Sequence, residues 1–338
     1  MRRILDAAGG ITEVSMRIGI LGAGNIAGTM AETLRQMEQV TCLAVGSRTL
    51  QKAQDFAGKY HFEKAYGSYE ELVSDPEVQL IYVATPHSHH CEHIKLCLEH
   101  GKHVLAEKAF TQNAAQAREV ISVAREKGLL LAEAIWPRYL PIRKTLEDVV
   151  ASGVIGRPTS LYAGLSFPIS HVERIKEPSL AGGVLLDVGV YPLNFATMVF
   201  GDDIEKISAT GVLTEKGVDN ITTAVLTYRD GRCAIIHSDA QAVCNRQGVV
   251  YGEKGYILVD GIINCQGIQV FDANSRLIAK YQPPKQISGY EYEVEACMEA
   301  IEKGWVECPQ MPHEEIIRIM EYMDEIRRQI GVVYPNEN

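Results

Sequence analysis

A chain of 338 residues is longer than a typical single domain, and 46% of its residues are hydrophobic, so we predict two domains with packed cores. Acidic residues outnumber basic ones by 43 to 33, for a formal net charge of −10, which argues against a nucleic-acid or anionic-membrane partner. No apolar run has the length that we expect of a membrane span, and the eight cysteines form no C-x-x-C pair, as is typical of reduced thiols in a cytoplasmic protein.

Residues 1–15 contain two arginines but no continuous apolar core, so they are not typical of a secretory signal, and we expect them to lie outside the fold. A short apolar strand then begins at Met16 and ends in a glycine turn that opens a helix. Gly22, Gly24 and Ala27 occupy the small-residue positions of G-x-G-x-x-G/A, a pattern typical of dinucleotide binding, because glycine lets a pyrophosphate approach the backbone. The predicted cofactor contacts in this turn are Gly22, Gly24, Asn25 and Ile26.

The end of the second strand, residues 40–45, decides between the two nicotinamide cofactors. An enzyme that prefers NAD places Asp or Glu about 20 residues beyond the glycines, where the carboxylate binds the ribose 2′-hydroxyl. This chain has Ser47 and Arg48 there, and Lys52 follows one helical turn later. A hydroxyl and two cations suit a 2′-phosphate, so the sequence favours NADP and leaves NAD as a second possibility. The alternative is that Arg48 and Lys52 only solvate the start of a helix.

Alternating helices and strands continue to residue 135 and predict a parallel, doubly wound sheet. In such sheets the loops at the carboxyl ends of the strands line the ligand crevice. A strand over 80–84 ends at a loop rich in histidine, and a strand over 104–106 ends at a Glu-Lys pair. The further cofactor contacts predicted at these two ends are Thr85, Pro86, His87, His90, Glu107 and Lys108. The other elements expected here are helices at 26–37, 52–60, 69–73, 91–100 and 113–127 and a strand at 129–134.

Six histidines lie between residues 87 and 103, and some of them are three or four residues apart. They match no H-E-x-x-H motif, and no cysteine or carboxylate completes an evident set of metal ligands. We therefore predict no metal site and expect these histidines to make the polar contacts of a loop.

The pattern changes after residue 135, where Trp136 and Pro137 introduce a helix that ends near Gly153. Short β-type segments separated by turns then predict a large open sheet, mostly antiparallel. Two helices close the chain, and we expect the second to pack back across the domain junction. The expected strands are 156–166, 204–214, 221–228, 232–240, 247–251, 256–259 and 268–271, and the expected helices are 290–303 and 313–330. The predicted domains are residues 16–135 and 136–338, both of α/β class.

The segment from Gly182 to Pro192 is typical of a helix start led by two glycines. In a helix, Asp187 and Tyr191 share a face and can meet Lys108 at the crevice. Hydride transfer to nicotinamide needs a base for the hydroxyl proton, and an adjacent ammonium group lowers the pKa of a tyrosine from its usual value of about 10. The predicted catalytic group is Tyr191 as acid/base, Lys108 as its activator and Asp187 as an orienting carboxylate. The alternative is a buried tyrosine and an ordinary Glu107/Lys108 surface pair.

Several motifs, in order along the chain, resemble those of one family. They are Gly22-Ala-Gly24, AYGSYEEL at 65–72, GKHVL at 101–105, Glu107-Lys108, EAIWPR at 133–138 and GGVLLDVGVY at 182–191. From about residue 16 to its end, the chain resembles the Gfo/Idh/MocA oxidoreductases, and most closely their branch of dimeric dihydrodiol dehydrogenases and NADP-dependent aldose dehydrogenases. The resemblance implies an N-terminal Rossmann domain, a C-terminal domain whose open sheet makes dimers or dimers of dimers, and NADP-linked oxidation of a vicinal diol or aldose.

The resemblance also implies roles for individual residues. It implies catalysis by Lys108 and Tyr191, and a nicotinamide end lined by Trp136 and Arg138. It places Arg48 and Lys52 where the branch has arginines that bind the 2′-phosphate, although a lysine makes a single point charge and softens the expected selectivity. The chain departs from the family pattern at Ala109, where proline is usual. Tyr191 stands where many members carry histidine, and this difference points to the dihydrodiol and aldose branch.

We therefore predict a cytoplasmic, NADP-preferring oxidoreductase that acts on a small sugar or diol. Trp136, Phe167 and Tyr191 are the predicted substrate contacts. The aromatic rings of Trp136, Phe167 and Tyr162 offer an apolar wall to an aromatic diol or a stacking face to a sugar. One alternative is a regulatory protein that binds NADP without turnover. Another is an enzyme of the same fold that recycles a tightly bound nucleotide.

Overall fold

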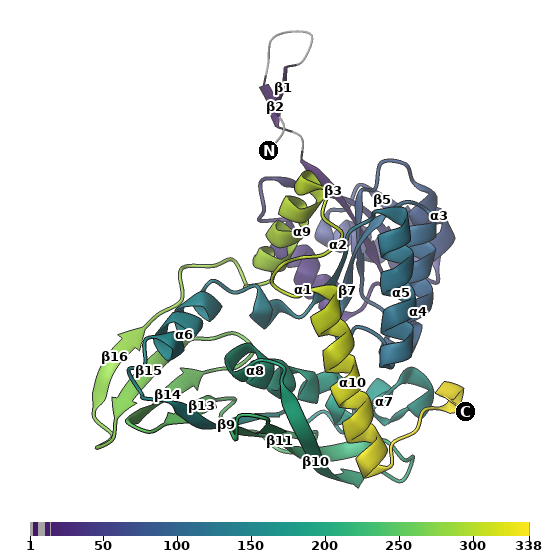
Figure 1. Ribbon diagram of the computed structural model, residues 1–338. Helices are drawn as coiled ribbons and strands as arrows, with labels where there is room; N and C mark the ends of the chain where they lie inside the picture. The colour runs from purple at the N-terminus through teal and green to yellow at the C-terminus, as the bar shows by residue number, and fades with distance from the viewer. Residues whose placement is uncertain (1–2, 6–10, 14, 338) are drawn as a thin grey trace.

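Two large β-sheets organise the molecule (Figure 1). The computed structural model describes all residues except 1–2, 6–10, 14 and 338. The two sheets and their helices confirm the predicted α/β class. Ahead of them, β1 (Arg3–Leu5) and β2 (Ile11–Glu13) pair as a separate antiparallel hairpin that projects from the rest of the chain in Figure 1.

The first sheet has six parallel strands in the order β5-β4-β3-β6-β7-β8. The central strand β3 pairs with β4 on one side and with β6 on the other, so the strand order reverses there and a crevice forms at the carboxyl ends. The short strand β5 is missing from the prediction, because three residues carry no periodic signal. The strands are β3 (Met16–Leu21), β4 (Val40–Gly46), β5 (Lys64–Tyr66), β6 (Leu80–Val83), β7 (His103–Glu107) and β8 (Leu131–Ala134).

Helices cover both faces of this sheet, which explains why the inner strand β6 is buried along its whole length (Figure 1). Side chains in the sequence fix where several of these helices begin: Thr49, Ser68 and Asn113 each accept a hydrogen bond from a backbone N–H three residues on. Gly128, in the left-handed conformation, ends α5 as predicted. The helices are α1 (Asn25–Leu34), α2 (Leu50–Tyr60), α3 (Tyr69–Ser74), α4 (His87–Glu99) and α5 (Ala114–Lys127).

The second sheet has eight strands in the order β10-β11-β12-β9-β13-β14-β15-β16. Only the β12/β9 pair is parallel, which confirms the predicted, mostly antiparallel sheet. Its strands are β9 (Pro158–Ser166), β10 (Ile204–Leu213), β11 (Asp219–Tyr228), β12 (Cys233–Asp239), β13 (Gly248–Gly252), β14 (Gly255–Asp260), β15 (Gly267–Asp272) and β16 (Leu277–Tyr281). The edge strand β16 was not predicted, because its side chains are mostly exposed and give no buried face.

Side chains alternate along the second sheet between a covered and an open face. On β9, Leu161, Ala163 and Leu165 are buried, whereas Tyr162 between them is 39% exposed. Two helices, α6 (Ile142–Ala151) and α8 (Val190–Phe200), lie over the covered face (Figure 1). The opposite face of the sheet carries neither of them.

The stretch Pro178–Phe200 corrects our expectation that no segment has the length and composition of a membrane span. It is the one stretch in the described part of the chain that meets both criteria, yet 83% of its apolar window is buried inside the protein. The stretch contains a short 3-10 turn (Pro178–Leu180), a π-helical turn (Leu185–Gly189) and α8. Its apolar character is explained by packing in the protein core.

The last two long helices return to the first domain. Helix α9 (Glu291–Lys303) packs against β7, and α10 (His313–Ile330) runs between α5 and β10 (Figure 1). At one end of α10, Arg125 of α5 pairs with Glu314 at 3.0 Å. Further along, Asp324 accepts the Ala114 N–H, and near the end Gln329 donates to the Ile207 carbonyl oxygen of β10. Through these contacts, α10 links helix α5 of the first sheet to strand β10 of the second sheet.

Candidate active site

The glycine turn between β3 and α1 brings backbone N–H groups to the crevice without a side chain in the way. Gly22 has a φ of +107°, and a Cβ there would lie 2.8 Å from the Ala84 carbonyl oxygen, so glycine is required between the ends of β3 and β6. Gly24 caps α1 without a side-chain hydrogen bond, and no described atom lies within 4 Å of where its Cβ would be. An open helix start of this kind suits a pyrophosphate.

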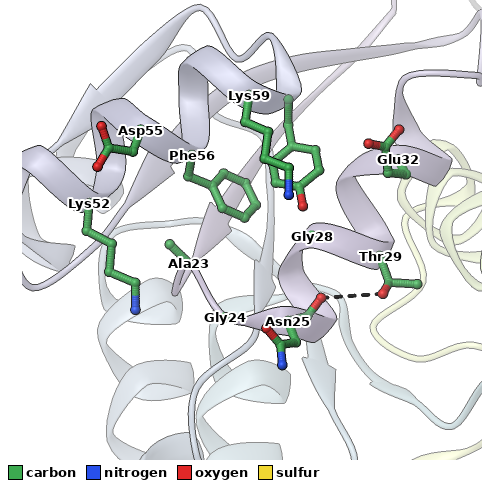
Figure 2. Close-up of a pocket in the computed structure, with 11 residues that line it drawn as sticks. Ala23, Gly24, Asn25, Gly28, Thr29, Glu32, Lys52, Asp55, Phe56 and Lys59 are labelled. Carbon is green, nitrogen blue, oxygen red and sulfur yellow. Dashed lines mark hydrogen bonds between the residues drawn. The ribbon is translucent and has the colours of Figure 1, made fainter.

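A cavity of about 450 Å³ continues from this turn between α1 and α2 (Figure 2). The Asn25 amide and the Lys52 and Lys59 amino groups lie along it, and the carboxylates of Glu32 and Asp55 lie on opposite sides of it. Near the glycine turn, the Asn25 amide, the Lys52 ammonium and the open backbone N–H groups suit a polar, phosphorylated ligand, whereas the two carboxylates do not. This cavity is the candidate phosphate end of the crevice, and Lys108 and Tyr191 are not among its lining residues.

The other residues predicted near the 2′-phosphate differ in exposure. Arg48 is exposed, and its charge lies close enough to Tyr69 to oppose the rise that burial causes in the pKa of that phenol. Ser47 is only 3% exposed, and its N–H donates to the Tyr66 carbonyl oxygen at 3.2 Å. Ile26 is partly buried against the hydrophobic core.

The histidine-rich segment is helical, which corrects the predicted loop. Helix α4 begins at His87, directly after Pro86, and the Nδ1 atom of His87 lies 3.3 Å from the Ala181 carbonyl oxygen. The two ring nitrogens of His90 lie 2.7 Å from the Thr85 carbonyl oxygen and 2.9 Å from that of Ala109, so this ring ties the end of β6 to the end of β7. Among the described residues no group of three or more His, Cys, Asp or Glu is arranged to hold a metal ion.

Lys108, Asp187 and His87 meet at the far end of the crevice. Lys108 Nζ lies 3.4 Å from Asp187 Oδ1 and also donates to the Asp187 carbonyl oxygen. Arg174 Nη1 donates to the same Oδ1 at 2.8 Å, and these two cations hold the pKa of the buried Asp187 carboxyl far below its usual range, although burial alone raises it. Burial lowers the pKa of His87 to about 3, so its ring is neutral near pH 7.

Tyr191 lies beside this cluster, with its ring centroid 5.0 Å from Lys108 Nζ. Burial raises the pKa of Tyr191 well above its usual value, and the Glu107 carboxylate adds to the rise. This corrects the prediction that Lys108 lowers the pKa of Tyr191. The reason is geometric, because Lys108 Nζ is directed at Asp187 and over the face of the phenol ring.

The turn that carries Asp187 is not a regular α-helix. Residues Leu185–Gly189 form a π-helical turn that runs into α8, a local widening that is common at functional sites. Asp219, on β11, holds its start: its carboxylate accepts the Leu185 N–H at 2.8 Å and the Thr222 hydroxyl at 2.6 Å. The predicted i,i+4 spacing of an α-helix is thus replaced by a wider turn, which the sequence could not show because Asp219 lies on another element.

Glu107 and Lys108 occupy the end of β7, as the strand pattern predicted, but their roles in the structure differ. The Glu107 carboxylate is buried, accepts the Tyr82 hydroxyl and accepts the Lys108 backbone N–H at 3.2 Å. Glu107 therefore braces the strand end, and the open alternative of an ordinary Glu/Lys surface pair does not describe these two residues. The peptide bond that follows, between Lys108 and Ala109, is cis.

Three residues predicted at the nicotinamide or substrate end lie in different places. Trp136 is 8% exposed and stacks on Tyr290, with ring centroids 4.4 Å apart. Phe167 is partly buried, and the Arg246 guanidinium lies 4.5 Å from its ring centroid. The structure does not bring Arg138 to the crevice. Its guanidinium is 1% exposed and is held by Asn194, Thr197 and Glu315.

Sequence reasoning missed several residues around the site. Arg174 lies on a four-residue helix, α7 (Glu173–Lys176), which has no periodic signal. Glu293 and Tyr290 reach the site from α9 and the residue before it, about 100 residues beyond Tyr191. Glu133, at the end of β8, is buried beside Glu107, and burial raises its pKa to about 8. A buried carboxyl at a strand end is the only one of these features that a pattern search could have found.

A glycine turn at the switch point of a parallel sheet, with lysine, aspartate and tyrosine at the far end of the crevice, is the arrangement of a nicotinamide-dependent oxidoreductase. Residues 16–134 match the family model described as an oxidoreductase family with an NAD-binding Rossmann fold, and residues 144–258 match the GFO/IDH/MocA C-terminal domain. The chain belongs to the Gfo/Idh/MocA family, as the sequence motifs predicted.

The relatives are dehydrogenases and reductases. The chain is 35% identical over 333 residues to trans-1,2-dihydrobenzene-1,2-diol dehydrogenase of Bos taurus, a match that covers 96% of this chain and 99% of the relative. The enzyme of the same name from Homo sapiens is 34% identical over 332 residues, with the same coverage. A solved structure of a 3-ketoreductase from Actinomadura kijaniata, in complex with NADP and TDP-benzene, aligns with a TM-score of 0.86 and 26% identity, over 94% of this chain and 98% of that chain. The protein is an NAD(P)-dependent oxidoreductase.

Proposed function

We propose that the protein transfers a hydride between a vicinal diol or sugar hydroxyl and NADP, with Tyr191 as acid/base and Lys108 as its partner. The observation that carries this proposal is the cluster at the carboxyl end of β7, where Lys108 Nζ lies 5.0 Å from the Tyr191 ring centroid and touches Asp187. The similarity to enzymes named as diol dehydrogenases supports the substrate class.

The bound cofactor supplies the hydride chemistry, accepting or returning a hydride at the nicotinamide ring. Tyr191 holds the proton of the reacting hydroxyl at its phenol oxygen, and Lys108 orients that hydroxyl from the neighbouring strand. Because burial raises the pKa of Tyr191, the phenol is protonated near neutral pH and is ready to donate to a forming alkoxide. Oxidation needs the phenolate, so we expect its rate to rise with pH.

The preference for NADP is supported by the exposed Arg48 and by Lys52, which lines the cavity beside the glycine turn. Neither position carries a carboxylate that would repel a 2′-phosphate. Trp136 and Phe167 are the aromatic residues that we propose for the substrate wall.

Steady-state reduction of NADP, and separately of NAD, tests this proposal across aldoses, inositols and trans-dihydrodiols, with Lys108→Ala as the control. Turnover of one class with NADP, lost in the variant, is the expected result. NADPH binding without turnover of any substrate would instead support the regulatory alternative. Nucleotide that is released only on denaturation would support internal recycling.

We also propose that the open face of the second sheet joins two copies of the chain. Its register aligns Ile235, Tyr162, Val249 and Leu258 across four adjacent strands. Ile235 and Tyr162 are 42% and 39% exposed, which is unusual for large apolar side chains in the middle of a sheet. Sedimentation velocity should give a dimer for the native chain and a monomer for Ile235→Asp; a native monomer would contradict this proposal.

A further inference from the structure

Arg174 stands at the mouth of the catalytic cluster and is its most accessible member. Its side chain is 46% exposed, whereas those of Asp187 and Lys108 are 9% and 13% exposed. Arg174 Nη1 donates to Asp187 Oδ1 at 2.8 Å. A guanidinium has five N–H donors in a planar fork, and in the described part of the chain this is the one side-chain hydrogen bond that Arg174 makes.

The Asp187 side chain makes its described ion-pair contacts through one of its two carboxylate oxygens. Lys108 Nζ, Arg174 Nη1 and His87 Nε2 approach the same oxygen, Oδ1, at 3.4, 2.8 and 4.0 Å. Among the described residues, none of these contacts uses Oδ2. A carboxylate can accept about four hydrogen bonds, so Asp187 keeps acceptor capacity on the oxygen that its cations leave open.

The backbone fixes Arg174 against the catalytic turn. The Gly183 N–H donates to the Ile175 carbonyl oxygen at 2.8 Å, and the Gly182 N–H donates to that of Glu177 at 3.0 Å. A Cβ at Gly182 would lie 2.8 Å from the Arg174 carbonyl oxygen, so only glycine lets the two segments approach this closely. The backbone at Arg174 is therefore tied to the turn that carries Asp187, and the hydrogen bond to Asp187 Oδ1 directs the Arg174 side chain toward the site.

We propose that Arg174 binds the substrate oxygen on the carbon next to the reacting one, together with Asp187 Oδ2. The neighbouring hydroxyl donates its proton to Oδ2 and accepts an N–H of the Arg174 fork, while the reacting hydroxyl lies at Tyr191 and Lys108. This inference rests on the proposed oxidoreductase function and adds a residue that makes the site select vicinal oxygen atoms. A site built to hydrogen-bond a hydroxyl rejects an analogue that lacks it, because its polar groups are then left unpaired.

The test compares trans-cyclohexane-1,2-diol with cyclohexanol, which lacks only the second oxygen. Binding of each compound to the enzyme with saturating NADP is measured by calorimetry, and kcat and KM are measured alongside, for the native protein, Arg174→Met and Arg174→Lys. Loss of a charge-assisted hydrogen bond should weaken binding of the diol roughly 10- to 100-fold in Arg174→Met and leave cyclohexanol unchanged. Arg174→Lys should recover part of the loss, since it restores the charge without the fork.

The matched control is Lys176→Met, which removes another cation from the same short helix and should leave both compounds unchanged. Equal weakening of both compounds in Arg174→Met, or no weakening of either, would overturn the inference. A third outcome separates the two proposals. If the native protein binds the diol more tightly than cyclohexanol, Arg174→Met binds both equally, and neither compound is turned over, then Arg174 binds the second oxygen but the proposed reaction is wrong. Unchanged NADPH fluorescence and an unchanged unfolding midpoint show that the variant keeps its fold.

Discussion

The charged side chains at the two ends of the crevice differ in their exposure to solvent and in whether they already have partners within the protein. At the far end, Lys108 and Asp187 are nearly buried and already touch each other. At the phosphate end, Arg48 and Lys52 are exposed. Reacting groups must be in place before the substrate arrives, so contacts within the protein offset their desolvation. Exposed cations keep their hydration until a ligand binds, so we expect binding at the candidate phosphate end to depend on salt more strongly than contacts at the far end.

Tyr191→Phe gives the largest effect that we expect at the buried end. Removing the proton donor and acceptor should lower kcat by about 10² to 10⁴, the usual contribution of general acid–base catalysis. NADPH binding, measured by fluorescence, should be unchanged, because the phenol lies away from the cavity beside α1. A variant with native kcat would remove Tyr191 from the acid/base role.

Gly24→Ala tests whether the open helix start is a binding surface. Gly24 has a φ of −92° and open space at its Cβ position, so alanine should leave the unfolding midpoint unchanged. A methyl group in the path of a pyrophosphate should weaken NADPH binding by about 1 to 3 kcal/mol, a typical penalty for overpacking. Gly22→Ala is the contrasting variant and should lose stability, because its φ is +107° and the Ala84 carbonyl oxygen is too close. Native affinity in Gly24→Ala would place the pyrophosphate elsewhere.

Arg48→Ala tests the exposed end directly. Loss of one charged hydrogen bond to the 2′-phosphate should weaken NADPH by about 1.5 kcal/mol, roughly tenfold, and leave NADH nearly unchanged. The difference should shrink as salt is added, since the cation is exposed. Arg229→Ala, which removes an exposed cation beside the second sheet that pairs with Asp203, is the matched control. Equal weakening of the two cofactors would contradict the assignment.

Glu133→Gln tests whether the buried end holds a neutral carboxyl, through the pH dependence of the free energy of unfolding. Its effect should be smaller than those of the variants above. Burial raises the pKa of Glu133 to about 8 in the folded protein, whereas in the unfolded chain this carboxyl has its usual pKa of about 4.5. Between these two pH values the folded protein holds a proton at Glu133 that the unfolded chain has lost. Its contribution to stability is present at low pH and is lost as the pH rises toward 8. From pH 6 to 7 the native protein should therefore lose about 1 kcal/mol of unfolding free energy relative to Glu133→Gln.

Urea unfolding at the two pH values measures this difference. Glu119→Gln is the control, since Glu119 is exposed on α5, pairs with Lys95 and has a lowered pKa, so it does not titrate in this range. A difference between native protein and Glu133→Gln that stays constant with pH would show that the buried end does not hold a neutral carboxyl at this position.

Local features of the sequence predicted the elements at both ends. The glycine turn, the Ser47-Arg48 end of β4 and the Glu107-Lys108 end of β7 each depend on a few adjacent residues. A parallel sheet then brings the carboxyl ends of its strands to one edge, which is why residues far apart in sequence could be assigned to one crevice. Elements without such a pattern were missed, namely the three-residue strand β5, the exposed edge strand β16 and the short helix α7.

Burial, and contacts between residues on distant elements, could be known only from the folded chain. Arg138 follows Trp136 closely in sequence, yet α8 and α10 draw its guanidinium into the interior. The pKa of Tyr191 rises because burial and Glu107 act on it, whereas the sequence pointed only to Lys108. The family, the strand ends and the glycine turn could be inferred from the amino-acid sequence, since they depend on contiguous residues. The direction of each charge and the shift of each pKa depend on desolvation and on neighbours from other elements, which no local pattern contains.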